Sequence, residues 1–208
     1  MCCSYEPAIE SLNTLLEHIP WDPSLRELRA EAYLGLGNVV HAISDIRSVT
    51  KLTSDNTAGY YKLASLHYQI GEADESLNEI RECLKLDPEH KDCFPLYKKL
   101  KKVVKFLVKA KEAREQQNWE ECVDAAGKVL KNEPTVTMIR FHGHDRLCHC
   151  QKEAGRSSES RKACGEALRI QDEPRLYCDR AEAYLQEDMF DEVRNHQQFP
   201  VIRSIENL

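Results

Sequence analysis

The chain has 208 residues, and its 35 acidic and 29 basic side chains give a formal net charge of -6. The length suits one large or two small domains, and the acidic balance argues against nucleic acid or an anionic membrane as the main partner. Apolar runs extend over only a few residues, so we expect no membrane span. Residues 1–7 contain neither a basic nor an apolar region, so no secretory signal is expected in this chain.

A spacing of 34 residues recurs along the first half of the chain. Ala30 and Ala64 are separated by this distance, and Ala42 and Ser76 repeat it. It is the period of the tetratricopeptide repeat (TPR), in which two antiparallel helices, A and B, meet at small side chains. The pattern predicts an all-α TPR superhelical solenoid of antiparallel helix pairs that is incomplete at both ends.

Taken in chain order, the repeat positions divide the sequence into a series of helical segments and a tail. The predicted segments are the second helix of a truncated TPR at 1–22, a TPR at 23–56, a TPR at 57–90, a helical extension at 91–102, a TPR at 103–136, an irregular TPR at 137–174, a partial TPR at 175–193 and a divergent tail at 194–208.

The extension is predicted to be helical because it carries an apolar stripe, and the tail is predicted to diverge because it lacks one. Across 91–102 and into the next repeat, apolar residues recur at helical spacing: Leu96, Leu100, Val103, Leu107 and Ala110. One long helix is therefore expected. After residue 193 no such stripe continues, and Pro200 interrupts the segment. Because a solenoid end without a polar cap exposes apolar surface, we expect a fragment or a truncated product.

Several sequence runs within this frame carry a more specific resemblance. Residues 21–31 (WDPSLRELRAE), 81–87 (RECLKLD) and 179–185 (DRAEAYL) resemble the middle and later TPRs of the DnaJ homolog subfamily C member 3 family. These are TPR co-chaperones of the endoplasmic reticulum. The resemblance implies binding of unfolded client proteins, transfer to the lumenal Hsp70 through a J domain, and inhibition of eIF2-alpha kinases.

The chain also departs from this family. The early TPRs with the main substrate groove, the J domain with its His-Pro-Asp motif and the signal peptide have no counterpart in the sequence. We therefore expect no stimulation of an Hsp70 by this chain alone. The resemblance implies the endoplasmic reticulum lumen, whereas the chain made as written would stay in the cytosol.

The nine cysteines are the unusual part of the composition. Two pairs, Cys83 with Cys93 and Cys148 with Cys164, match disulfides of the resembled family, and the second pair would also lie face to face at small positions of two antiparallel helices. The alternative is that all four are reduced core cysteines. The sequence suggests no partner for the remaining five: Cys2, Cys3, Cys122, Cys150 and Cys178.

Two further clusters suggest chemistry, but each has a simpler interpretation. Five potential zinc ligands occur close together in the sequence: His142, His144, Cys148, His149 and Cys150. No second ligand pair completes a tetrahedral site, so we expect no metal. The long helix carries a run of lysines: Lys98, Lys99, Lys101, Lys102, Lys105 and Lys109. The run could attract an acidic partner, but a solvated helix face is the favoured interpretation. No phosphate loop, nucleophile motif or cofactor motif is present, so we expect a non-enzymatic protein.

The inward positions of the A helices predict the binding groove. They carry Leu28, Leu34, Tyr61, Lys62, Tyr68, Leu107 and Val108. The charged clamp that grips the chaperone C-terminus in other TPR proteins is not supplied, since Glu27 and Glu31 would repel a carboxylate. A mixed tyrosine and aliphatic groove suits extended apolar segments. The alternatives are a general TPR scaffold for one defined partner, and a groove that binds nothing in these repeats.

Overall fold

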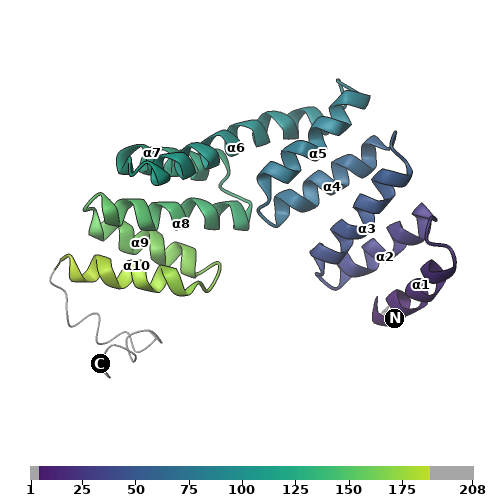
Figure 1. Cartoon of the computed structure of the whole chain (residues 1–208), viewed down its shortest axis with the longest axis horizontal. Coiled ribbons are helices and arrows are strands. Elements are labelled where there is room, and N and C mark those ends of the chain that lie inside the picture. The colour runs from purple at the N-terminus through teal and green to yellow at the C-terminus, as the bar shows by residue number, and fades with distance from the viewer. Residues whose placement is uncertain (1–4, 188–208) are drawn as a thin grey trace. The chain divides into compact units, whose positions relative to one another are not determined.

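The computed structural model describes residues 5–187, and in this range the chain folds into α-helices without any strand (Figure 1). The predicted all-α TPR fold is confirmed. The predicted tail at 194–208, together with Cys2 and Cys3, lies outside the described residues. The helices are α1 (Tyr5–His18), α2 (Pro23–Gly35), α3 (Val39–Leu52), α4 (Thr57–Gln69), α5 (Ala73–Leu86), α6 (Cys93–Glu115), α7 (Trp119–Asn132), α8 (Thr137–Glu153), α9 (Ser157–Leu168) and α10 (Pro174–Leu185).

Short polar residues and glycines fix where these helices begin and end. The Asp22 carboxylate accepts the backbone N–H of Ser24 at 2.8 Å and so caps α2. Asparagine caps α3, α4 and α7 in the same way. Gly37 and Gly71 follow α2 and α4 with φ of 74° and 88°, a left-handed conformation that a residue with a Cβ adopts only at a cost.

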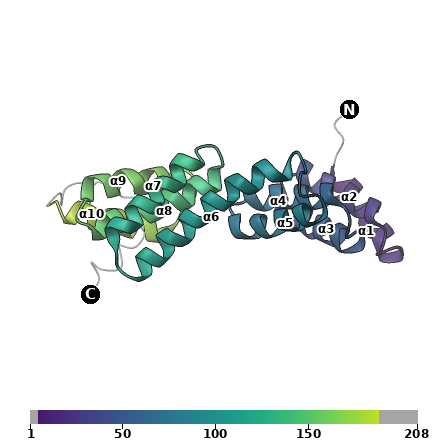
Figure 2. The same cartoon turned by 90° about the horizontal axis from the view of Figure 1, so that it is seen from above.

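The chain divides into two units, residues 1–101 and 102–208, and α6 runs through the division. In unit 1 each helix from α1 to α5 contacts the next one along the chain, and both views show them following one another in chain order (Figures 1 and 2). The small positions of the repeat lie at these contacts, because Ala30, Ala42 and Ala64 are fully buried. Ile46 and Leu63 fill the space between them.

Unit 2 repeats the scheme with α7 to α10 and the second part of α6. Consecutive helices from α7 to α10 pack together, and α8 also contacts α10. One detail recurs in both units: the Ser160 hydroxyl donates to the Cys148 carbonyl oxygen at 2.6 Å, and Ser76 donates to Ala64 at the same distance. In these two repeats the bond ties the B helix, α5 or α9, to its A helix, α4 or α8.

The long helix α6 begins at Cys93, within the segment predicted as a helical extension, and continues without interruption to Glu115. Leu100, Val103 and Ala110 are fully buried, as expected for the apolar stripe. No helix between residues 5 and 187 combines the length and the apolar character needed to cross a membrane.

Candidate protein-interaction site

Some residues of the predicted groove in unit 1 are accessible. The Leu28 side chain on α2 is 53% exposed. On α4, the half-buried Tyr61 ring stacks on His90 with 6.5 Å between ring centroids, and the Lys62 ammonium lies 3.7 Å from the Glu31 carboxylate. These side chains remain available to a ligand that approaches the A helices of unit 1.

Other predicted groove residues contribute to packing. Leu34 contacts the buried core of unit 1, Tyr68 is 6% exposed, and the Lys99 ammonium lies 5.8 Å above the Tyr68 ring. On α6, Leu107 is buried, whereas Val108 is 39% exposed. Val108 lines a hollow of about 530 Å³ whose other walls include charged side chains of α6 and α7. The predicted groove set therefore divides into residues that a ligand could touch and residues that hold the helices together.

The A helices of unit 2 carry a network of charged side chains centred on Lys152. Its ammonium is almost fully buried, lies 2.7 Å from the Asp179 carboxylate and also bonds Glu182. The His149 Nδ1 atom lies 3.3 Å from the same Asp179 oxygen. This network links α8 to α10, which lie one repeat apart.

Electrostatics keep both central groups of this network charged. Burial opposes the charge on Lys152, but hydrogen bonds to Asp179, Glu182 and Glu153 outweigh it and raise the pKa of the ammonium. Burial likewise favours the neutral form of Asp179, but the hydrogen bonds from His149 and Lys152 prevail and lower the pKa of that carboxyl. The contact between α8 and α10 is therefore ionic.

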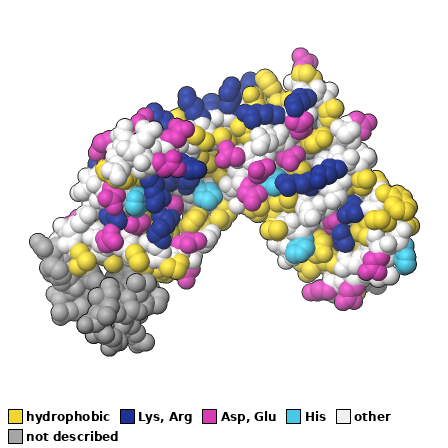
Figure 3. Space-filling model, viewed as in Figure 1, with side chains coloured by type: hydrophobic (Ala, Val, Ile, Leu, Met, Phe, Trp, Pro, Cys, Tyr) yellow, Lys and Arg dark blue, Asp and Glu magenta, His cyan; other side chains and the backbone are white. Residues whose placement is uncertain are grey.

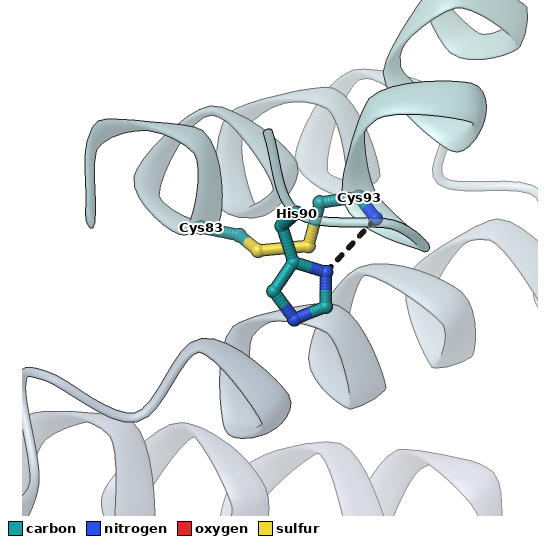
Figure 4. Close-up of side chains that lie close together, drawn as sticks. All are labelled: Cys83, His90 and Cys93. Atoms are coloured by element: carbon teal, nitrogen blue, oxygen red, sulfur yellow. Dashed lines mark hydrogen bonds between the residues drawn. A yellow bond between two sulfur atoms is a disulfide. The ribbon is translucent and has the colours of Figure 1, made fainter. Parts of the chain in front are cut away.

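In unit 1 the structure joins Cys83 of α5 to Cys93 at the start of α6 (Figure 4). The neighbouring His90 accepts the backbone N–H of Cys93 at its Nδ1 atom, at 3.3 Å, and so caps α6. In residues 5–187 these three side chains form the one group whose ligand atoms lie close enough together to hold a metal ion. The disulfide occupies both sulfurs, so this group offers only the imidazole while the bond is intact.

Unit 2 contains two more disulfides. Cys148 is bonded to Cys164, which links α8 to α9, and Cys122 is bonded to Cys150, which links α7 to α8. The sequence suggested no partner for Cys122 or Cys150. One signal was available, because residues two apart on a helix point in nearly opposite directions. If Cys148 faces α9, Cys150 on the same helix therefore faces α7.

The remaining cluster predictions can be placed as well. Because Cys148 and Cys150 belong to different disulfides, their sulfurs cannot complete a zinc site with His142, His144 and His149. Cys178 is a half-buried free thiol. In the lysine run, Lys98 lies over the Phe94 ring at 4.1 Å, Lys101 over Tyr97 at 5.9 Å, and Lys109 pairs with Glu121 at 2.8 Å. Lys98, Lys99, Lys101, Lys102 and Lys105 are exposed, in keeping with a solvated face.

Fold and site together define the class: the chain is a TPR array for protein interaction. The family model "Tetratricopeptide repeat" matches residues 58–90. Over 191 residues, or 90% of the chain, the sequence is 41% identical to DnaJ homolog subfamily C member 3 of Gallus gallus, and over 189 residues it is 40% identical to the protein of that name in Homo sapiens. The chain is a homologue of these co-chaperones over their TPR region, which is non-enzymatic.

A solved structure supports the same assignment. The crystal structure of the P58(IPK) TPR domain superposes on the chain with a TM-score of 0.81 at 41% identity, covering 91% of this chain and 53% of that one. The chain spans 38% of the length of the Gallus gallus and Homo sapiens relatives. The similarity therefore identifies a TPR region of this family rather than the whole co-chaperone.

Proposed function

We propose that the chain is the protein-binding region of an endoplasmic reticulum co-chaperone, which binds unfolded proteins and inhibits eIF2-alpha kinases in the unfolded protein response. The observation that carries the proposal is the 41% identity to DnaJ homolog subfamily C member 3 over 90% of the chain. The lumenal location rests on the same similarity. Three disulfides among the described residues support it, because such bonds persist in an oxidising compartment.

Client binding has a physical basis in the accessible side chains on the A helices of each unit. In unit 1, Leu28 exposes an apolar side chain and Tyr61 an aromatic face, and in unit 2, Val108 exposes an apolar side chain. An unfolded client exposes apolar residues in extended segments. Their binding is favoured because it removes apolar surface of the client and of these side chains from water. This binding needs no catalytic group, in keeping with a non-enzymatic TPR region.

The test is suppression of aggregation in two unrelated clients, reduced insulin and chemically denatured luciferase, followed by light scattering with the full chain. Leu28→Ser removes an exposed apolar side chain from the groove, and Val40→Ser removes one of similar exposure from a B helix. We expect the first variant to suppress aggregation less well than the unsubstituted chain, and the second to act like it.

The outcome separates the co-chaperone from a general TPR scaffold. A chain that leaves both clients to aggregate, yet captures one defined partner in a pull-down, is a scaffold, and the proposal of client binding is then wrong. Kinase inhibition is measured separately, as the rate at which a purified eIF2-alpha kinase phosphorylates its substrate with and without the chain. An unchanged rate contradicts that part of the proposal.

A further inference from the structure

Unit 2 contains a pocket of about 490 Å³ between the end of α6, the start of α7 and the middle of α8. It is lined chiefly by Lys111, Arg114, Glu115, Trp119, Arg146 and His149. We propose that this basic pocket binds the carboxylate groups of an acidic peptide segment. The proposal concerns a site and a ligand chemistry of its own and does not depend on the chaperone role.

The charge balance of the basic pocket favours an anion. Lys111, Arg114 and Arg146 carry permanent positive charges, whereas Glu115 is the only acid among the lining residues. Glu115 is well exposed, and its carboxylate is 4.0 Å from the Lys111 ammonium, so water and salt weaken its effect on a ligand. The lining therefore carries a net positive charge in a chain whose overall charge is negative.

Arg114 is the strongest candidate for direct contact with a carboxylate. Within residues 5–187 it forms no ion pair, and its half-buried side chain lies in the pocket wall. A guanidinium presents its N–H groups as a planar fork that matches the two oxygens of a carboxylate. A bidentate contact of this kind fixes both the position and the orientation of the bound acid.

The opposite wall is held in place by neighbouring groups. Arg146 donates an N–H to the His142 carbonyl oxygen at 3.1 Å, which anchors its guanidinium beside the pocket. The His149 Nδ1 atom faces Asp179, and its ring meets the Trp119 ring edge to face at 6.0 Å. The imidazole is therefore fixed between two partners, which leaves its other ring nitrogen for a ligand.

The acidic residues of α8 and α10 are held by cationic partners, and Asp179 also contacts one pocket residue, His149. Asp179 and Glu182 bond the buried Lys152, and Asp145 bonds Arg175. Figure 3 shows Lys, Arg and His side chains gathered over α8, with Asp and Glu side chains beside them. An incoming carboxylate therefore meets the guanidinium of Arg114, which forms no ion pair within residues 5–187.

The surroundings select a peptide rather than a nucleic acid. A phosphate strand would extend beyond a pocket of this size and meet the acidic surface of a chain with net charge -6. Trp119 adds an apolar wall against which a side chain next to the bound acid can pack. The expected ligand is therefore Asp or Glu beside an aliphatic or aromatic residue.

The test uses the full chain and a fluorescein-labelled peptide with repeated Glu-Glu-Leu-Glu blocks, with binding followed by fluorescence anisotropy. The pocket variant combines Arg114→Gln with Arg146→Gln. The control combines Lys101→Gln with Lys102→Gln, which removes the same charge from exposed positions of α6. Because a hydrogen bond to a charged group contributes more than a neutral one, we expect the pocket variant to weaken binding at least tenfold and the control less than twofold.

Two further arms keep the result decisive. A peptide with Gln in place of Glu should bind at least tenfold more weakly, and Lys111→Gln, at an exposed position, reports on the basic pocket if the double variant does not fold. The proposal is overturned if the labelled peptide does not bind at millimolar protein, or if pocket and control variants weaken binding equally. Equal binding of the Gln peptide, or tighter binding of a single-stranded oligonucleotide, overturns it too.

Discussion

Removing the Cys122–Cys150 disulfide should destabilise one part of the chain by a calculable amount. The two sulfurs join α7 to α8 across 28 residues of sequence, and both side chains are fully buried. If the bond acts by restricting the unfolded chain, a loop of this length corresponds to about 3.6 kcal/mol at room temperature. The double variant Cys122→Ala with Cys150→Ala should lose about that much, with a smaller added loss from the missing sulfur contacts.

The assay is urea unfolding of the oxidised protein, followed by circular dichroism. With a slope of about 2 kcal/mol per molar urea, the loss should lower the midpoint by roughly 1.5–2 M. Repeat arrays unfold in segments, so amide exchange should place the loss in α7 and α8 rather than in unit 1. Cys178→Ala serves as the control, since this thiol is free and should change the midpoint little.

Two results would refute this reasoning. The first is a midpoint for the double variant within about 0.3 M of that of the oxidised parent, which would mean that the bond does not constrain the unfolded chain. The second is peptide mapping under non-reducing conditions that finds Cys122 and Cys150 as free thiols after expression in a secretory compartment. Mapping of the other two bonds in the same experiment shows whether oxidation itself succeeded.

Three further predictions concern a turn, an ion pair and a titrating group. Gly71→Ala should cost about 1–2 kcal/mol in urea unfolding because φ there is 88°, whereas Gly165→Ala, in open space within a helix, should be neutral or stabilising. Lys152→Met should cost about 3–5 kcal/mol, since it leaves the buried Asp179 carboxylate without its nearest cation. In a double-mutant cycle, Lys152→Met combined with Asp179→Asn should cost less than the sum of the two single changes. Burial lowers the pKa of His142, so as the pH falls below about 6.5 the imidazole is protonated first in the unfolded chain, and the stability of the fold should decline. His142→Gln should therefore flatten a plot of the urea midpoint against pH between 7.5 and 5. An unchanged slope would contradict the role of His142.

Much of the fold could be predicted because its signals are local. The 34-residue spacing of Ala30 and Ala64 reflects the close approach of paired helices, and both residues are fully buried. Gly37 and Gly71 mark turns that require positive φ. The apolar stripe through Leu100 and Val103 predicted one long helix. Each signal is carried by residues close together in the sequence or by their recurrence at the repeat period.

The candidate sites could be predicted only in part, because they depend on contacts between repeats. Tyr68 occupies a groove position in the TPR pattern, but its neighbours bury it, and pattern alone cannot show how far a helix face is covered. The pairing of Cys122 with Cys150 requires α7 and α8 to meet in one particular register. In the irregular repeat at 137–174 the sequence does not define that register.

The sequence by itself therefore determined the repeat, the helix pairs, the turns and the family, all of which follow from short-range spacing and from similarity. Only the tertiary structure decided which charges meet. Lys152 and Asp179 stand 27 residues apart, and Arg114 and Arg146 stand 32 apart, so each pair comes together through the stacking of successive repeats. Charged residues are usually exposed to solvent, and a sequence pattern does not show which of them a neighbouring helix buries or brings together.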